Sequence, residues 1–242
     1  MAGASAATDA GHGSTGRRSR LRNLLEIVVA YLLILLVIWT PRPWQRYLWW
    51  IAAAAVAAIL SISFDGLQAM GLRAANFGRS SWIVGAALLV AGAAVLIASR
   101  LHTLHVPGTP LAFVLTYFAY AIWCGVQQFL LQAFFLLRLL RLIPRPARAA
   151  LAAAGIFAAA HLPNPVLTPL TLMWGIASCL IFLRYRNLYS LALAHAILGI
   201  TIAMTIPGPV DHNMRVGLGY LMYSPHQHAH RPYLYEHLLT KP

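Results

Sequence analysis

Long apolar segments are the feature that most constrains the fold of this chain. Apolar residues make up 60% of it and charged residues only 10%, whereas about a quarter of the residues in a soluble domain are charged. Most of the segments are close to the roughly 20 apolar residues that a helix needs to cross a bilayer. The sequence therefore predicts an all-α, multipass transmembrane helix bundle with about seven spans. We place these spans at residues 23–40, 44–64, 81–99, 110–137, 148–162, 166–183 and 188–206.

Basic residues gather at the ends of these segments. The chain has 18 Lys and Arg residues against 5 Asp and Glu, which gives a formal net charge of +13. If the N-terminus is cytoplasmic, the cytoplasmic loops hold twelve of the 18, and this bias is the usual determinant of membrane orientation. We therefore exclude nucleic acid as a partner. We expect a bacterial cytoplasmic (inner) membrane protein, embedded in the lipid bilayer, with its N-terminus in the cytoplasm.

The two ends of the chain are polar. Residues 1–22 are predicted to form a disordered cytoplasmic tail, because they are rich in small residues and have no apolar period. Residues 23–108 are assigned to N-terminal transmembrane helices and residues 109–206 to a core domain. Residues 207–242 form a polar, His-rich C-terminal tail. Its alternating histidines, His226, His228 and His230, are a pattern that can bind metal, but no acid or cysteine completes a ligand set, and a solvated tail is the preferred interpretation.

Five polar side chains inside the apolar segments are the candidate functional residues. They are Gln127, Gln128, Gln132, His161 and His195. A polar group removed from water needs a protein partner, and polar residues within membrane spans commonly mark functional sites. A single glutamine could equally be a hydrogen-bonding contact between helices, worth ~1 kcal/mol. Three glutamines within six residues, together with two histidines, favour a shared pocket.

Helical spacing adds neighbours to these five residues. At 100° per residue, Tyr120 and Cys124 lie on the same stripe as the glutamines, and such a stripe should face the interior of the bundle. The fifth segment ends at His161-Leu-Pro-Asn-Pro165, where two prolines stop the helix. We expect a loop there at partial membrane depth, buried in protein or lining a wet cavity. The glycines at positions 125, 155, 175 and 199 are expected to allow close contact between helices.

These residues resemble the motifs of the CPBP family of intramembrane endopeptidases, the CAAX protease and bacteriocin-processing family. The resemblance covers roughly residues 110–205. The family's Glu-Glu-xxx-Arg motif reads Gln127-Gln128-Phe-Leu-Leu-Gln132 here. Its Phe-xxx-His motif is intact as Phe157-Ala-Ala-Ala-His161, and its His-xxx-Asn motif reads His195-Ala-Ile-Leu-Gly199. The resemblance implies a CAAX-protease-like core that acts on membrane proteins or lipidated peptides.

The resemblance also implies roles for individual residues. In the family, the first glutamate activates a water molecule, while the histidines and the asparagine position that water or stabilise the oxyanion. The implied catalytic residues are Gln127 in the position of the base, Gln128 beside it, His161 orienting water and His195 facing the oxyanion. Gly199 has no side chain where the amide donor would be. The implied substrate-binding residues are Tyr120, Gln132, Phe157, Asn164 and Gly199.

The glutamines change the chemistry that this site can perform. A glutamine amide can orient a water molecule but cannot hold its proton, so the glutamate mechanism cannot operate unchanged. A neutral histidine, His161 or His195, is a competent base. Two histidines with neutral amides make a poor zinc site, and we expect no metal or other cofactor. Among the acids, Glu26 and Asp65 lie at span ends, where we expect them to face water or lipid headgroups.

Three classes of function follow from these observations. The leading hypothesis is an endopeptidase-family protein that binds and cleaves membrane-associated or lipidated peptides at a buried Gln/His site. The alternative is a catalytically silent family member that acts as a membrane peptide-binding scaffold or immunity factor. A small-solute transporter is disfavoured, because the spans lack central charges and the chain shows no internal repeat.

Overall fold

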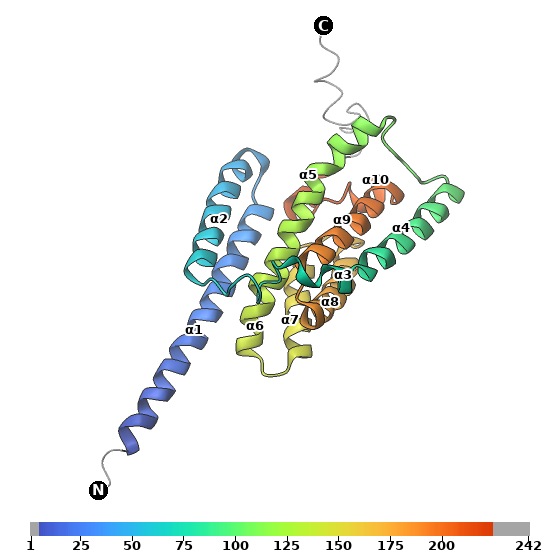
Figure 1. Cartoon of the computed structure of the whole chain (residues 1–242). Coiled ribbons are helices and arrows are strands. Elements are labelled where there is room, and N and C mark those ends of the chain that lie inside the picture. The colour runs from blue at the N-terminus through green and yellow to red at the C-terminus, as the bar shows by residue number, and fades with distance from the viewer. Residues whose placement is uncertain (1–4, 225–242) are drawn as a thin grey trace.

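A computed structural model describes residues 5–224, and this part of the chain folds as a bundle of helices without a strand (Figure 1). Six helical stretches are long and apolar enough to cross a membrane. This finding confirms an all-α multipass bundle and an integral membrane protein. The six stretches are residues 19–38 of α1 (Ser5–Ile38), α2 (Arg42–Ile62), α4 (Trp82–Arg100), the continuous helix Pro110–Leu142, α8 (Leu167–Tyr185) and α9 (Leu188–Thr205).

The fifth expected span is a shorter helix. Helix α7 (Pro146–Ala159) has 14 residues, or about 21 Å at 1.5 Å per residue, which is less than the hydrocarbon thickness of about 30 Å. The expected count of about seven spans is therefore reduced to six. The remaining short elements are η1 (Ala74–Asn76), α3 (Phe77–Ser80), α10 (Gly208–Asp211) and α11 (Gly217–Leu221).

The N-terminal segment is helical, in contrast to the expected disordered tail. Helix α1 begins at Ser5 and continues without a break into the first membrane span. Alanine and arginine are good helix formers, and the apolar span that follows extends the same helix. At the other end, residues 207–224 of the expected polar tail carry α10 and α11. The histidines at 226, 228, 230 and 237 lie outside the described residues.

The helices form two groups in space (Figure 1). Helices α1 and α2 make a hairpin on one side, while α9 packs against both α5 (Pro110–Phe129) and α4, and α7 packs against α8. The long helix that begins with α5 continues through a π-helical segment, η2 (Leu130–Leu136), into α6 (Leu137–Leu142). Side chains of η2 supply much of the core, including Leu131, Phe134 and Leu136. The π segment follows the glutamine pair directly, and π-helical turns occur frequently at functional sites.

Close backbone contacts fix the turn that leads into α9. The backbone N–H of Leu188 donates to the carbonyl of Gly71 over 2.9 Å. Gly71 has a φ of +73°, and a Cβ atom at this position would lie 2.5 Å from the Phe182 ring, so only glycine fits. Asn187 caps α9 by accepting from the backbone N–H of Ser190 over 3.0 Å. These contacts define the start of the helix that carries His195.

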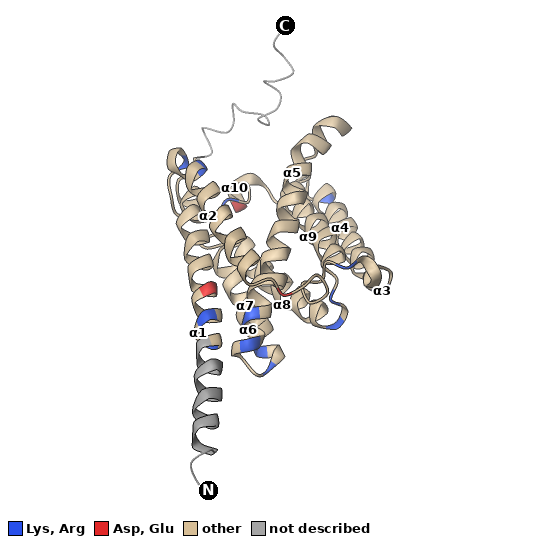
Figure 2. Ribbon diagram, turned by 60° about the vertical axis from the view of Figure 1, so that its left-hand side comes forward, with Lys and Arg blue, Asp and Glu red and all other residues tan. Residues whose placement is uncertain are grey.

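Two acids expected to face water or headgroups are instead paired with arginines. Arg138 on α6 is fully buried, and its guanidinium lies 2.7 Å from the Glu26 carboxylate of α1 and 3.6 Å from that of Asp65. Arg141 bonds the Asp65 carboxylate, and Arg22 bonds that of Glu26. The pairs lie toward the arginine-rich end of the bundle (Figure 2). The two acids can be buried because the arginines neutralise their carboxylates when the helices pack, and an unpaired buried charge would be costly.

We expect Arg138→Met to lower the free energy of unfolding. The change leaves the Glu26 and Asp65 carboxylates without their buried partner, at a cost of about 3 kcal/mol, the low end for a broken buried pair because Arg22 and Arg141 remain. Thermal unfolding in detergent measures the loss. Arg145→Met, at an exposed arginine of the α6–α7 turn, is the matched control. Equal Tm values for the two variants would contradict a stabilising role for the buried pairs.

Candidate functional site

A chain of hydrogen-bonded polar side chains connects α5, α8 and α9 inside the bundle. Gln128 and Gln132 have no exposed surface, and His195 is 7% exposed. The Gln128 amide nitrogen lies 3.2 Å from Nδ1 of His195. Gln132 donates from its amide nitrogen to Oε1 of Gln128 over 3.3 Å and to Oγ of Ser178 over 3.0 Å. The structure therefore brings Gln128, Gln132 and His195 together, in line with the expected inward-facing stripe.

The direction of these bonds sets the tautomer of His195. Oε1 of Gln128 accepts from Gln132, so the Gln128 group that faces His195 is the amide nitrogen, which carries only hydrogens. Nδ1 of His195 must then accept, and the ring proton resides on Nε2. His195 consequently presents an N–H donor on the side of the ring away from Gln128.

His161 has the opposite arrangement. It follows the end of α7 in the loop to α8, outside the six membrane-spanning stretches. Its Nδ1 lies 2.8 Å from the backbone carbonyl of Phe157. A carbonyl only accepts, so Nδ1 carries the proton and Nε2 keeps a free lone pair. Burial lowers the pKa of His161 below its ordinary value, and the bond to Phe157 raises it by a smaller amount. His161 thus offers a neutral acceptor.

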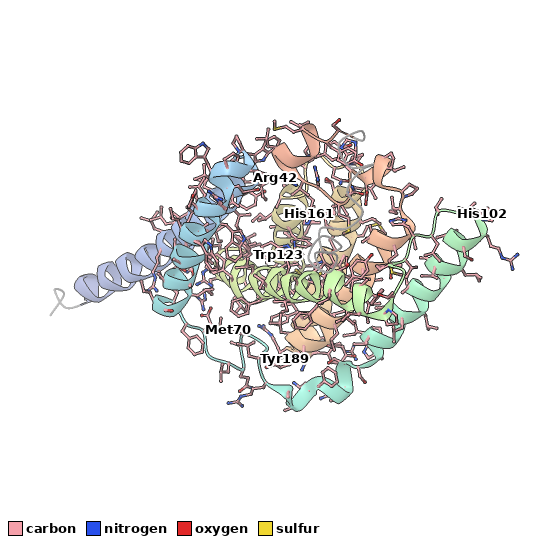
Figure 3. The ribbon with its side chains drawn as sticks, turned by 90° about the horizontal axis from the view of Figure 1, so that it is seen from above. Arg42, Met70, His102, Trp123, His161 and Tyr189 are labelled. Atoms are coloured by element: carbon pink, nitrogen blue, oxygen red, sulfur yellow. The ribbon has the colours of Figure 1, made fainter. Side chains whose placement is uncertain are left out.

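The Phe157 ring contacts both histidines. Its centroid lies 4.9 Å from that of His161 and 5.9 Å from that of His195, with edge-on geometry in both cases. The ring of Trp174 on α8 lies 6.0 Å from His195 on another side. Seen from above, His161 lies within the ring of helices, whereas His102 and Tyr189 lie at its periphery (Figure 3). The two histidines therefore share one aromatic-walled region.

Gln127 lies outside the hydrogen-bonded chain. Its side chain is partly exposed and forms no hydrogen bond with the described part of the protein. Gln128, the second residue of the doublet, is the one that bonds His195. The doublet therefore contains one amide with a fixed orientation and one amide that is free to bind something else.

Gly199 and Tyr120 meet between α9 and α5. A Cβ atom at position 199 would lie 2.2 Å from the Tyr120 hydroxyl oxygen. Gly175 similarly lies against α7, where a Cβ atom would be 3.0 Å from that of Ala154. These two glycines allow close helix contact, as expected. Gly125 and Gly155 do not, because a Cβ atom there would have no neighbour within 4 Å.

Asn164 has a role that its sequence position did not indicate. Its amide nitrogen donates to the backbone carbonyls of Asp211, over 2.7 Å, and of Arg215, over 3.0 Å. Its side-chain oxygen accepts from the backbone N–H groups of Val166 and Leu167. All four hydrogen-bonding positions of the amide are used. Asn164 thus begins α8 and holds the segment after α9 in place, and its expected contact with a substrate stays a prediction.

Three further residues of this region were not predicted from the sequence. The Ser178 hydroxyl accepts a hydrogen bond from the Gln132 amide and donates one to the backbone carbonyl of Gly175 over 3.2 Å. The indole N–H of Trp174 is buried without a partner among the described residues. Asp211 is 1% exposed, and burial raises the pKa of its carboxyl. A serine or tryptophan in an apolar span is too common to signal a site, and only the folded chain identifies these two as neighbours of the glutamines and His195.

Among the described residues, no group of three or more His, Cys, Asp or Glu side chains lies close enough together to hold a metal ion. The two cysteines, Cys124 and Cys179, are buried and free. The arrangement offers an imidazole acceptor at His161, an imidazole donor at His195, and amides and hydroxyls around them.

Comparison with known protein families gives one match. Residues 110–201 match the family described as type II CAAX prenyl endopeptidase Rce1-like. The matched region runs from the start of α5 into α9 and contains the glutamines and both histidines. No curated protein and no solved structure matches the chain significantly.

We expect Asn164→Ala to loosen residues 207–217 without unfolding the bundle. The change removes both donors that hold this segment, at a cost of about 1–3 kcal/mol for an unsatisfied buried group. Amide hydrogen exchange in 207–217 should accelerate at least about tenfold. Asn164→Asp retains the two acceptors for α8 and should accelerate exchange in the same segment only. Asn76→Ala, which removes a surface bond to Tyr185, is the control; an unchanged rate in both Asn164 variants would refute the assignment.

Proposed function

We propose, on the premise that residues 110–201 belong to the CPBP family of type II CAAX prenyl endopeptidases, that this protein binds membrane-associated or lipidated peptides and hydrolyses a peptide bond with a histidine as general base. The family's name supplies the class of substrate. The polar chain between α5, α8 and α9 supplies the site. We place this activity in a bacterial cytoplasmic membrane, with the N-terminus of α1 in the cytoplasm.

The complementary tautomers of the two histidines carry this proposal. His161 has its proton on Nδ1, bound to Phe157, and a free Nε2 lone pair. His195 accepts at Nδ1 from Gln128 and carries its proton on Nε2. Hydrolysis of an amide needs both functions, because one group must take a proton from water and another must stabilise the oxyanion. Phe157 contacts both rings and keeps the two functions close together.

In the proposed reaction, a water molecule attacks the carbonyl carbon of the peptide bond while Nε2 of His161 takes one of its protons. A carbon–oxygen bond forms, and the carbonyl oxygen becomes an oxyanion that accepts from Nε2–H of His195. The carbon–nitrogen bond then breaks, and His161 returns the proton to the departing nitrogen. The products are a carboxylic acid and an amine, and His161 is neutral again.

The glutamine doublet supports this reaction without acting as a base. Gln128 holds His195 in the donor tautomer. Gln127, whose side chain is free of the rest of the site, is proposed to orient the attacking water or the backbone of the peptide. An amide can perform both tasks because it offers a donor and an acceptor. Gln132 maintains the orientation of Gln128 from the next turn.

Cleavage tests the proposal directly. Purified protein in liposomes should cleave a quenched-fluorescent farnesylated peptide that ends in a CAAX sequence. His161→Ala should lower the rate by about 10²–10⁴-fold through loss of the base, and His195→Ala by about 10²–10³-fold through loss of an oxyanion donor. His102→Ala, at the periphery of the bundle, is the control. Cleavage that both site variants retain would refute the assignment.

The pH dependence of the rate follows from the base. His161 acts only when Nε2 is unprotonated, so activity exists above its pKa and disappears as the pH falls through it. Because burial lowers this pKa below its ordinary value, the rate should stay constant above about pH 6.5 and decline in more acidic buffer. Initial rates of peptide cleavage from pH 4 to 8 measure this. A profile that stays flat over the whole range would exclude a histidine base.

One observation favours a second candidate, a catalytically silent peptide-binding scaffold or immunity factor. Both positions of the family's glutamate doublet carry glutamine, and an amide cannot replace a carboxylate as a base. This candidate predicts that the wild-type protein binds the farnesylated peptide without cleaving it. Gln127→Glu should then create activity from an inactive protein. If the wild-type protein already cleaves, the silent candidate is excluded.

A further inference from the structure

The contact between Tyr120 and Gly199 lies one helical turn from His195. The family motif carries an amide side chain at position 199, and this chain carries none. The Tyr120 hydroxyl oxygen lies 2.2 Å from where a Cβ atom at 199 would be, and the ring carbons Cε1 and Cζ lie 2.9 and 3.0 Å from it. A side chain at 199 and the tyrosine ring therefore exclude one another.

The distance between the Tyr120 hydroxyl oxygen and a Cβ position at 199 can be compared with the dimensions of an asparagine side chain. In an asparagine side chain, the amide nitrogen and oxygen lie about 2.4 Å from Cβ, as standard bond lengths and angles require. The Tyr120 hydroxyl oxygen, at 2.2 Å, is at nearly the same distance from that point. A hydrogen-bond donor thus lies about as far from position 199 as the amide group of an asparagine there would lie, although this donor comes from α5 and not from α9.

The hydroxyl is also available to a ligand. Its side-chain partner is the thiol of Cys124, one turn further along α5, and a thiol is a weak acceptor. An oxyanion is a far stronger acceptor, and hydrogen bonds to charged oxygens are about twice as strong as neutral ones. The hydroxyl therefore gains by turning from the thiol to a substrate oxygen.

The position also suits a second donor beside His195. Residues 195 and 199 are four apart on α9, which is about 6 Å along the helix axis. Two donors that serve one oxygen, each about 3 Å from it, can be up to about 6 Å apart. Position 199, and with it the Tyr120 hydroxyl that lies against it, is therefore one turn of α9 from His195, and paired donors of an oxyanion hole approach one oxygen from neighbouring positions.

We propose that the Tyr120 hydroxyl is the second oxyanion donor of this site and takes the place of the amide side chain that the family motif carries at position 199. The inference rests on the proposed hydrolysis, and Gly199 acquires a function through it. Glycine is required at 199 because only the absence of a side chain admits the tyrosine ring. Tyr120 is in this sense a catalytic residue contributed by a different helix.

The test compares kcat and KM for the farnesylated CAAX peptide in liposomes. Tyr120→Phe retains the ring and removes only the hydroxyl, so kcat should fall about 10²-fold while KM changes less than about twofold, because the donor acts mainly on the developing oxyanion. Tyr31→Phe on α1, a partly buried tyrosine that packs against Phe135, is the matched control and should leave both constants unchanged.

A compensating pair of changes separates chemistry from packing. Gly199→Asn alone should be inactive and less stable, since its side chain meets the Tyr120 ring. Tyr120→Ala alone should lose the donor. Combining the two removes the ring and supplies the amide, so the double variant should exceed Tyr120→Ala in kcat by at least about tenfold. A purely structural role for Tyr120 predicts no such recovery.

The outcomes distinguish this inference from the function on which it rests. If the wild-type protein cleaves and Tyr120→Phe retains its kcat, the donor role is overturned while the histidine mechanism stands. A double variant no more active than Tyr120→Ala would overturn the replacement of the amide in the same way. If the wild-type protein binds the peptide without cleaving it, the proposed hydrolysis fails, and the donor role is refuted with it.

Discussion

The hydrogen bond between Gln128 and His195 is the interaction on which the rest of the site depends. It lies between two membrane-spanning helices, where Gln128 has no exposed surface and His195 is 7% exposed, so each group must satisfy the other. Because Gln132 and Ser178 continue the same chain of bonds, three helices share one polar contact. The bond joins α5 to α9. It also determines which nitrogen of the imidazole carries the proton.

An amide in this position has a different consequence from a carboxylate. A carboxylate at 128 would accept a hydrogen bond from Nδ1–H of His195 and leave Nε2 unprotonated, so the imidazole would offer an acceptor to a ligand. The Gln128 amide nitrogen reverses this order, and the imidazole offers a donor. In the proposed reaction, the base therefore comes from a group outside the doublet. His161, with its own proton bound to the Phe157 carbonyl, takes that role in the proposal.

The molecule separates its charged and neutral polar contacts. Glu26 and Asp65 pair with arginines near the arginine-rich end of the bundle, and these pairs hold the α1–α2 hairpin to α6. Beside the rings of Phe157 and Trp174, the polar groups described around His195 are uncharged amides, a hydroxyl and an imidazole. This distribution follows the cost of burying an ion, which is highest where water is furthest away. The carboxylates therefore serve the assembly of the bundle, and the site uses neutral donors and acceptors.

Much of this protein could be predicted from its sequence, because hydrocarbon thickness imposes a length and a composition on every spanning helix. The apolar segments, the inward face of Gln128 and Gln132, and the Phe157–His161 pair all follow from helical period and composition. The shortness of α7 and the helix from Ser5 did not follow, because they depend on where neighbouring helices end and continue. Asn164 had a plausible place beside His161, yet its four bonds go to backbone groups of residues 166, 167, 211 and 215.

The sequence by itself determined that this is a multipass membrane protein with neutral polar groups in its spans, and it showed motifs that resemble those of a family of intramembrane endopeptidases. Only the tertiary structure decided which glutamine bonds His195, which nitrogen each histidine presents, and that a tyrosine from α5 occupies the space above Gly199. The reason is geometric. Periodicity places a side chain on a face of its own helix, whereas a hydrogen bond between helices depends on their relative rotation and depth, and these are settled only when the helices pack together.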